Sequence, residues 1–290
     1  MSTMIKGFGL SQPDNTKGYL EHAIAAANAC LAQVECPLDE IDLLINAGIY
    51  RDNNTCEPSV AALIQHGLGI HLNPITTPVR KHTFSFDVLN GACGLLNALQ
   101  IAHSILETKQ QTRALLIAGE SHPSMQPDDN FPLEHSAVAL LVERSEQGGF
   151  TTFQFQSTPQ FQGRSGYLDL AVHQTASRHS LAFEETTETT TLPTFIETVV
   201  ESYLSKHNIN PDETTLLLAH PDSTLGNNLA QSLGMSLAVG TFDWQTLGDL
   251  NSAGLGFGLA ATIPSATKDT LCVVLGTGAT VGCALYRQSN

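Results

Sequence analysis

Cys93 is the residue whose type and position most directly predict covalent chemistry in this chain of 290 residues. It follows the apolar run Phe84–Leu89 and a glycine, Gly91, and it opens the apolar stretch Cys93–Glu107, which is typical of a long helix. Unpaired N–H groups and the helix dipole at a helix N-terminus favour a thiolate and a developing oxyanion. The pattern predicts acyl transfer through a nucleophilic cysteine, and a buried structural cysteine is the alternative.

The composition of the chain excludes several classes of function. The formal net charge is −15 and the basic residues are dispersed, so we expect no nucleic-acid partner. The cysteines contain no CxxC pair, so neither a disulfide framework nor a metal site is expected. No segment has the about 20 uninterrupted apolar residues that span a bilayer, and the first residues do not resemble a signal peptide. We therefore expect a cytoplasmic protein that does not contact the membrane.

Apolar strands and amphipathic helices alternate along the chain, and the same order occurs twice. In the first half we predict strands from residue 5 and at 41–49, 84–89, 114–119 and 137–143, with helices at 18–33, 58–67 and 93–107. In the second half we predict strands at 151–156, 216–219, 237–242, 272–275 and 281–285, with helices at 194–207, 224–233 and 252–263. The repetition predicts two βαβαβαββ halves, residues 1–148 and 149–290, in which helices flank parallel strands.

Several segments, in the same order, resemble the β-ketoacyl-acyl-carrier-protein synthase III branch of the thiolase superfamily. They are Ile41–Ile45, Pro58–Ile70, the elbow Phe86–Cys93, His220 at the end of a strand, and the glycine-rich Leu275–Leu285. The resemblance covers most of the chain and implies an α/β thiolase-like fold with five layers, α-β-α-β-α. It also implies that Cys93 accepts the acyl group and that His220 is the catalytic histidine, although the usual His-Gln-Ala-Asn has become His-Pro-Asp-Ser here.

The third catalytic residue of this family is an asparagine in a Gly-Asn motif, and two placements compete in the sequence. Matching the glycine to Gly248 puts Asp249 in the asparagine's place and keeps the following Ser-Ala together. Matching the amide instead selects Asn251 and loses the glycine. We favour Asp249 and keep Asn251 as the alternative.

The choice between these residues bears on the reaction. Two neutral donors, a histidine N–H and an asparagine amide, stabilise the enolate that forms when a malonyl group loses carbon dioxide. An ionised aspartate cannot donate, and it would instead orient His220 as a base toward an alcohol, amine or thiol. Condensation and simple acyl transfer both stay open.

The resemblance also implies roles for the glycine-rich turn near the C-terminus. The main-chain N–H groups of Cys93 and Thr277 would form the oxyanion hole, and Gly276 and Gly278 would line the substrate site. Thr277 stands where the family has a glycine. A second departure is the stretch Leu133–Ala137, which replaces a Gly-Asp-Gly-Ala-Gly sequence and is expected to change the tunnel wall or the dimer face.

We expect an acyltransferase of the β-ketoacyl synthase III type that binds no cofactor and uses acyl-CoA or acyl-carrier-protein thioesters as substrates. The expected reaction is decarboxylative condensation with a malonyl-type thioester in fatty acid or polyketide-type biosynthesis. One alternative is a Cys-His-Asp acyltransferase that does not decarboxylate its substrate, and another is a non-catalytic partner subunit of a heterodimeric synthase. Family habit favours a dimer, either of this chain with itself or with a related synthase. The basic run Arg80–His82 could meet the phosphates of coenzyme A or an acidic carrier protein.

Overall fold

The computed structural model describes residues 1–72, 75, 82–108, 112–158, 165–167, 178–184, 192–238, 244–276 and 280–289. The strands of the first half are β1 (Ser2–Ser11), β2 (Leu43–Asn46), β3 (Phe84–Asp87), β4 (Arg113–Glu120) and β5 (Ser136–Ser145), and its helices are α1 (Tyr19–Gln33), α2 (Val60–Leu68) and α3 (Gly94–Leu106). The strands of the second half are β6 (Gly149–Ser157), β7 (Ser165–Tyr167), β8 (Ala182–Glu184), β9 (Thr214–Ala219), β10 (Ser236–Leu237), β11 (Asp269–Gly276) and β12 (Thr280–Arg287). Its helices are α5 (Leu192–Lys206), α6 (Ser223–Leu233), α7 (Trp244–Leu247) and α8 (Gly254–Thr262).

Ten strands form one sheet in the order β10-β9-β11-β12-β6-β1-β5-β4-β2-β3. Read from each edge inward, it contains two sets of five strands with the same order, β10-β9-β11-β12-β6 and β3-β2-β4-β5-β1. In each set four strands run in one direction, and the fourth strand from the edge, β12 or β5, runs antiparallel to them. The sets meet where β1 runs beside β6, and Thr3 pairs with Phe150 there. The predicted repetition of βαβαβαββ is confirmed by these two equivalent sets of strands.

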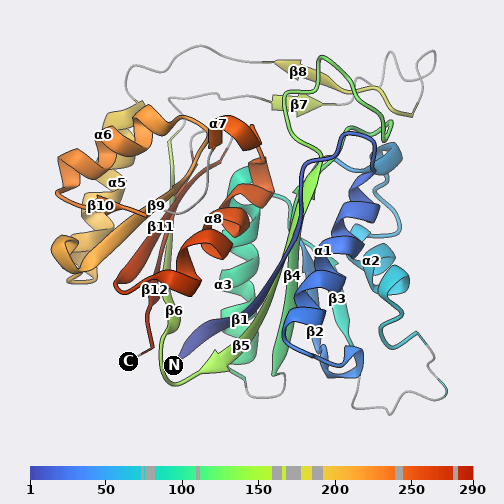
Figure 1. Cartoon of the computed structure of the whole chain (residues 1–290), viewed down its shortest axis with the longest axis horizontal. Coiled ribbons are helices and arrows are strands. Elements are labelled where there is room, and N and C mark those ends of the chain that lie inside the picture. Colours follow the sequence, from blue (N-terminus) through green and yellow to red (C-terminus); the bar gives the residue numbers. More distant parts are fainter. Residues whose placement is uncertain are drawn as a thin grey trace.

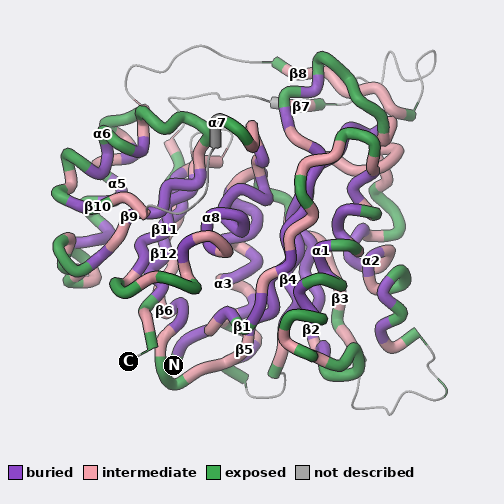
Figure 2. Tube along the Cα trace, viewed as in Figure 1, coloured by how far each residue is buried: buried purple, intermediate pink, exposed green. Residues whose placement is uncertain are grey.

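Helices lie in three layers around the two sets of strands (Figure 1). Helices α1 and α2 cover one outer face, α5 and α6 cover the other, and α3 and α8 lie between the two sets. The buried residues fall into three matching clusters, and Figure 2 shows that the central strands and helices are buried along most of their length. Strands β2 and β4 carry apolar residues on both faces because helices cover both faces. The predicted five-layered α/β arrangement is therefore confirmed.

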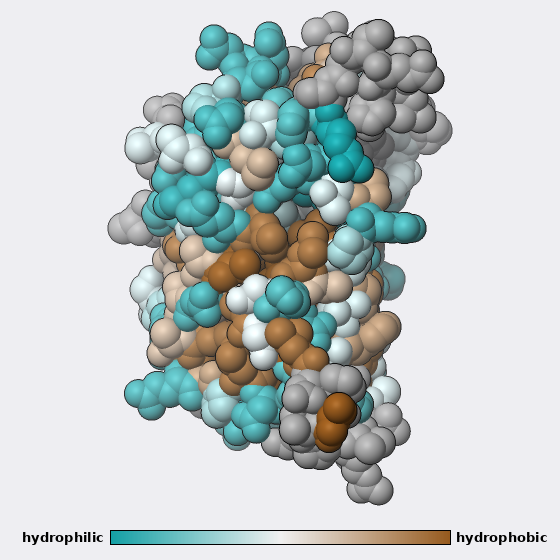
Figure 3. All heavy atoms as spheres, turned by 90° about the vertical axis from the view of Figure 1, so that its right-hand side faces the viewer, coloured by the Kyte–Doolittle hydropathy of each residue, from teal (hydrophilic) through white to brown (hydrophobic). Residues whose placement is uncertain are grey.

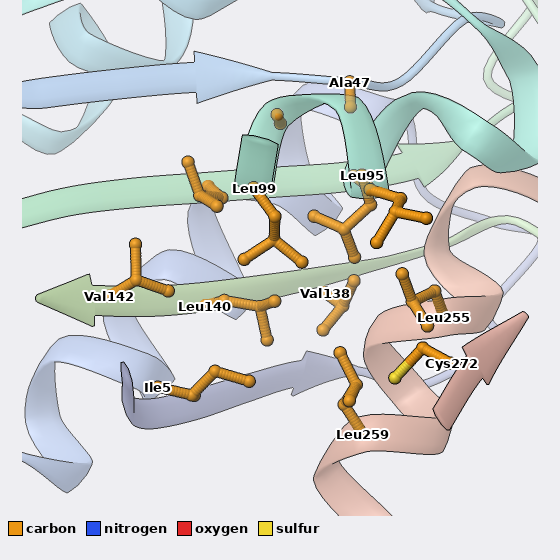
Figure 4. Packing of buried hydrophobic residues seen from close by; sticks show 14 of the residues in the cluster. Ile5, Ala47, Leu95, Leu99, Val138, Leu140, Val142, Leu255, Leu259 and Cys272 are labelled. Carbon is orange, nitrogen blue, oxygen red and sulfur yellow. The ribbon is translucent and has the colours of Figure 1, made fainter. Parts of the chain in front are cut away.

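The central layer is tightly packed, and this packing fixes where the two central helices begin. In Figure 4, Leu95 and Leu99 of α3 point toward Val138 and Leu140 of β5, while Leu255 of α8 lies beside a cysteine of β11. Glycines let α8 approach both sets of strands: a Cβ at residue 256 would lie 2.5 Å from a methyl carbon of Val138. Close packing of this kind holds the N-termini of α3 and α8 in place.

The sequence predicted each main helix and strand, although several boundaries moved by a few residues. Strand β1 is longer than expected, and β2 is shorter than the predicted 41–49. Much of the strand predicted at 237–242 lies outside the described residues, and β10 ends at Leu237. The pair β7 and β8 was not predicted.

Two further properties concern the surface. In the described part of the chain, no helix is long and apolar enough to cross a membrane. Figure 3 looks at the side of the molecule that carries α1 and α2, and it shows hydrophobic residues gathered across the middle of this face. Strand β3 ends the sheet on the same half of the molecule, and its Phe84 is 57% exposed.

Candidate active site

Cys93 lies at the start of α3, as predicted from the sequence. Strand β3 is followed by a short turn and then by the 3₁₀ turn Gly91–Cys93, which leads directly into α3. Gly91 has φ +51°, a left-handed conformation that glycine adopts without steric cost. The turn therefore aims the chain so that the cysteine caps the helix inside the central layer, where it is fully buried.

The sulfur of Cys93 contacts the two strands that close the second half. Its Sγ donates to the carbonyl oxygen of Thr280 at 3.7 Å, and a Cβ added at Gly276 would lie 3.0 Å from the sulfur. Burial raises the pKa of the thiol to about 12, and main-chain N–H groups of Gly276 and Gly282 only partly oppose the shift. Desolvation raises the pKa of this thiol and therefore opposes the effect expected of the helix N-terminus, which favours a thiolate.

The N–H of Cys93 is already used within the turn. It donates to the carbonyl oxygen of Asn90 at 3.0 Å. An acyl oxygen at this position would have to share that donor. Thr277 and Gly278, the other predicted members of the oxyanion hole and substrate site, lie outside the described residues, as do Arg80 and Lys81.

His220 follows the last residue of β9, as the sequence predicted. Strands β9 and β11 are parallel neighbours, with Ala219 opposite Val274, so His220 lies at the same end of this sheet as Gly276, which packs against the sulfur of Cys93. The main-chain N–H of Asp222 donates to Nδ1 of His220 at 3.1 Å. Because Nδ1 accepts this hydrogen bond, the neutral ring carries its proton on Nε2.

Asp249 and Asn251 occupy a single turn before α8. Asp249 Oδ1 accepts a hydrogen bond from the main-chain N–H of Asn251 at 2.9 Å, so this carboxylate stabilises the turn. Asn251 has φ +42° and begins the 3₁₀ turn Asn251–Ala253, which leads into α8. The arrangement repeats that of Gly91 and Cys93 before α3, and the two 3₁₀ turns lie against each other in the central layer.

Glu120, the last residue of β4, is a buried carboxylate that the sequence reading missed. Its side chain is fully buried and accepts the Asn251 Nδ2–H at 2.8 Å on Oε1. Its other oxygen, Oε2, accepts the main-chain N–H groups of Ile49 and Tyr50 at 3.2 and 2.7 Å. Burial raises the pKa of Glu120 to about 7, against the lowering effect of these donors. The signal in the sequence was a single acidic residue at the end of an otherwise apolar strand.

The altered stretch Leu133–Ala137 packs against the same turn. The main-chain N–H of Glu134 donates to the carbonyl oxygen of Asp249 at 2.9 Å, and its carboxylate lies over Gly248. Burial, followed by the charge of Asp249, raises the pKa of Glu134. His135 is buried, and its Nε2 accepts the main-chain N–H of His122 at 3.0 Å, which gives it a structural role.

No metal site is evident in the part of the chain that the structure describes. Within it, no group of three or more His, Cys, Asp and Glu residues has a geometry that could hold a metal ion.

The fold of this chain is similar to that of solved synthase structures. The 3-oxoacyl-[acyl-carrier-protein] synthase III of Aquifex aeolicus superposes with a TM-score of 0.77 over 99% of this chain and 100% of that chain, at 18% sequence identity. The chain has the thiolase fold. At this identity the likeness shows the fold alone, and no family model matches the sequence.

Two curated relatives match part of the thiolase-like chain. The β-ketoacyl-[acyl-carrier-protein] synthase III of Clostridium perfringens is 32% identical over 113 residues, which are 39% of this chain and 30% of that protein. The acyl-CoA:acyl-CoA alkyltransferase of Xanthomonas campestris is 32% identical over 99 residues, which are 34% of this chain and 26% of that protein. The matched stretches thus span less than a third of these relatives. Together with the structural match, they confirm the resemblance to the synthase III branch of the thiolase superfamily.

Proposed function

We propose that this thiolase-like protein is an acyltransferase that carries an acyl group on Cys93 and condenses it with a malonyl-type thioester, with loss of carbon dioxide. The observation that carries the proposal is the hydrogen bond from Asp222 N–H to Nδ1 of His220. It leaves Nε2–H as the donor on a neutral imidazole, and condensation needs such a neutral donor for the enolate oxygen. The names of the relatives, a synthase and an alkyltransferase acting on thioesters, point to the same class of reaction.

The first step would load Cys93. The sulfur attacks the carbonyl carbon of an acyl-CoA or acyl-carrier thioester, the bond to the leaving sulfur breaks, and the proton of Cys93 passes overall to the released thiol. Because the pKa of the Cys93 thiol is about 12, the proton leaves as the acyl group arrives and not beforehand. The N–H groups of Cys93 and Thr277 would hold the oxyanion, with the donor of Cys93 shared between the acyl oxygen and Asn90. Gly276 and Gly278 would line the space for the acyl chain.

The second step would form the carbon–carbon bond. The malonyl thioester loses carbon dioxide, and the electron pair becomes an enolate whose oxygen accepts Nε2–H of His220. The enolate carbon attacks the acyl carbonyl carbon, the bond to the sulfur of Cys93 breaks, and the departing thiolate takes up a proton from water to regenerate the thiol. The second donor in this proposal is Asn251, whose Nδ2 has two hydrogens and gives one to Glu120.

Asp249, the placement that the sequence favoured, is the alternative third residue in this proposal. In that case its carboxylate would orient His220 as a base, and the protein would transfer the acyl group to an oxygen, nitrogen or sulfur acceptor without decarboxylation. In this route Nδ1 of His220 would carry a proton and donate it in a hydrogen bond to the carboxylate of Asp249. In the structure, Nδ1 instead accepts a hydrogen bond from the main-chain N–H of Asp222. The geometry around His220 therefore favours condensation over transfer.

Substrates and partners follow from the same proposal. The acyl donor would be acyl-CoA or an acyl carrier protein, with no bound cofactor, in fatty acid or polyketide-type biosynthesis in the cytoplasm.

We also propose a dimer with a second copy or with a related synthase, which would cover the exposed Phe84 at the sheet edge. The native mass of the wild type and of Phe84→Lys tests this, since the variant should be smaller if that edge is the contact.

The products distinguish condensation from transfer. Wild type, Asn251→Ala and Asp249→Asn would each be incubated with an acyl-CoA and a malonyl thioester, and carbon dioxide release and product mass would be measured. We expect a β-ketoacyl product with wild type and a loss of about 10²–10⁴-fold in Asn251→Ala, the range for positioned donors and acid–base groups. Acyl transfer without carbon dioxide, abolished by Asp249→Asn, would favour the alternative reaction. If no thioester reacts, both reactions are excluded, and the alternative of a non-catalytic partner subunit is favoured.

A further inference from the structure

Glu120 lies where the two halves of the molecule meet at the candidate site. It ends β4 in the first half, and its Oε1 accepts the Asn251 Nδ2–H at 2.8 Å and the Ser252 N–H at 3.4 Å from the second half. Oε2 accepts the N–H groups of Ile49 and Tyr50, which follow β2. One carboxylate therefore joins the loop after β2 to the turn that begins α8.

The burial of this carboxylate requires such partners. Glu120 has no exposed surface, and an ionised carboxyl group inside a protein is retained only where hydrogen bonds replace water. Each of its oxygens accepts two donors, and a proton on either oxygen would displace one of them. The hydrogen-bonding pattern of Glu120 therefore fits the ionised carboxylate, although burial raises its pKa.

The turn that Glu120 holds contains a residue with an uncommon backbone conformation. Asn251 is in the left-handed region at φ +42°, which asparagine tolerates but does not prefer. A second bond from the second half to the end of β4 joins Ser252 Oγ to the carbonyl oxygen of Gly119 at 3.2 Å. The same turn carries Asp249, whose Oδ1 accepts the N–H of Asn251. Both candidates for the third catalytic residue thus depend on the end of β4.

We propose that Glu120 is a positioning residue that acts through Asn251: it fixes the amide of Asn251 and the turn before α8 in the orientation that the reaction requires. The proposal rests on the proposed function, in which Asn251 is the second donor. Glu120 itself is fully buried, and in this proposal it contacts Asn251 and does not contact the substrate.

A double-mutant cycle tests the proposal. Glu120→Gln, Asn251→Ala and the double variant would be compared with wild type for the rate of product formation from loaded enzyme, with KM measured separately. If Glu120 acts through Asn251, Glu120→Gln should lower kcat about tenfold in the wild type and change it less than about twofold in Asn251→Ala. The KM for the acyl donor should change little, because Glu120 does not touch that substrate.

The matched control is Glu143→Gln. Glu143 pairs with Arg113 at the opposite end of β4. The variant therefore removes a carboxylate from the same sheet, far along the strand from the turn before α8. It should leave kcat unchanged. An equal loss for Glu120→Gln with and without Asn251 would overturn the proposal, and so would an equal loss in Glu143→Gln.

The outcome also separates this proposal from the proposed function. The same four proteins would be unfolded in urea. If Cys93 is never acylated, both the function and the catalytic role of Glu120 fail, whatever the unfolding shows. If wild type is active but the effects of Glu120 and Asn251 are additive in rate and in stability, the function stands and the positioning role fails.

Discussion

At the scale of single residues, the proposed reaction depends on two side chains, Cys93 and His220, whose protonation is set by their surroundings. Burial raises the pKa of the Cys93 thiol to about 12, and Nδ1 of His220 accepts the N–H of Asp222. The sequence identified both residues and their places at the ends of a strand and a helix. The sequence did not predict their protonation, because it depends on the desolvation of Cys93 and on the main-chain N–H that bonds to His220 in the folded chain.

The pH dependence of cysteine alkylation tests the state of Cys93. With a pKa of about 12, the thiolate fraction rises about tenfold for each pH unit below that value. Alkylation of Cys93 by iodoacetamide should therefore keep rising between about pH 7 and 10, as followed by peptide mass spectrometry. The exposed Cys56 in the same samples reports on the reagent. A plateau for Cys93 near neutral pH would show that the thiolate is favoured after all.

At the scale of elements, the ends of strands and the starts of helices build the site. Helices α3 and α8 each follow a 3₁₀ turn whose first residue has a positive φ, and each turn packs against a strand end from the opposite half. Periodicity predicted these helices and strands well because their burial is regular. It could not predict the contact of Glu120 with Asn251, since the two lie 131 residues apart and only the fold brings them together.

The end of β11 gives a prediction at this scale. Gly276→Ala would place a methyl group 3.0 Å from the sulfur of Cys93, which is tight enough to restrict an acyl group on that sulfur. We expect acylation at least about tenfold slower with the protein still folded, since strain in a packed site costs about 1–3 kcal/mol. The rate would be measured by intact-protein mass spectrometry.

Gly226→Ala is the control for that substitution. A Cβ at Gly226, inside α6, would have ordinary contacts of 3.7 Å or more, and alanine favours a helix more than glycine does. This variant should acylate at the wild-type rate and be as stable as wild type or more so. Equal rates for Gly276→Ala and wild type would show that the acyl group does not pass this strand end.

At the scale of the whole molecule, the two halves are joined by the central helices and by the carboxylate of Glu120. The pKa of Glu120 is raised from 4.5 to about 7, so the folded protein holds this proton more tightly than the unfolded chain does. The unfolding free energy should therefore fall as the pH rises from about 4.5 through about 7, because the folded state must release a proton that it binds more tightly than the unfolded chain does.

Urea unfolding over a range of pH tests that linkage. Between about pH 5 and 7, the unfolding free energy of wild type should fall relative to Glu120→Gln by up to about 1.4 kcal/mol per pH unit, and the difference should level off above pH 8. Glu143→Gln should instead run parallel to wild type across this window. Parallel curves for wild type and Glu120→Gln would mean that this carboxyl does not titrate there.

The proposed function requires an acyl group on Cys93, and the mass of the intact protein detects that group. Wild type and Cys93→Ala would be incubated with a panel of acyl-CoA and acyl-carrier thioesters, and the mass gained would be mapped by peptide analysis. We expect one acyl group on wild type, located on Cys93, and none on Cys93→Ala. No acylation with any donor, or equal acylation of both proteins, would contradict the proposed function.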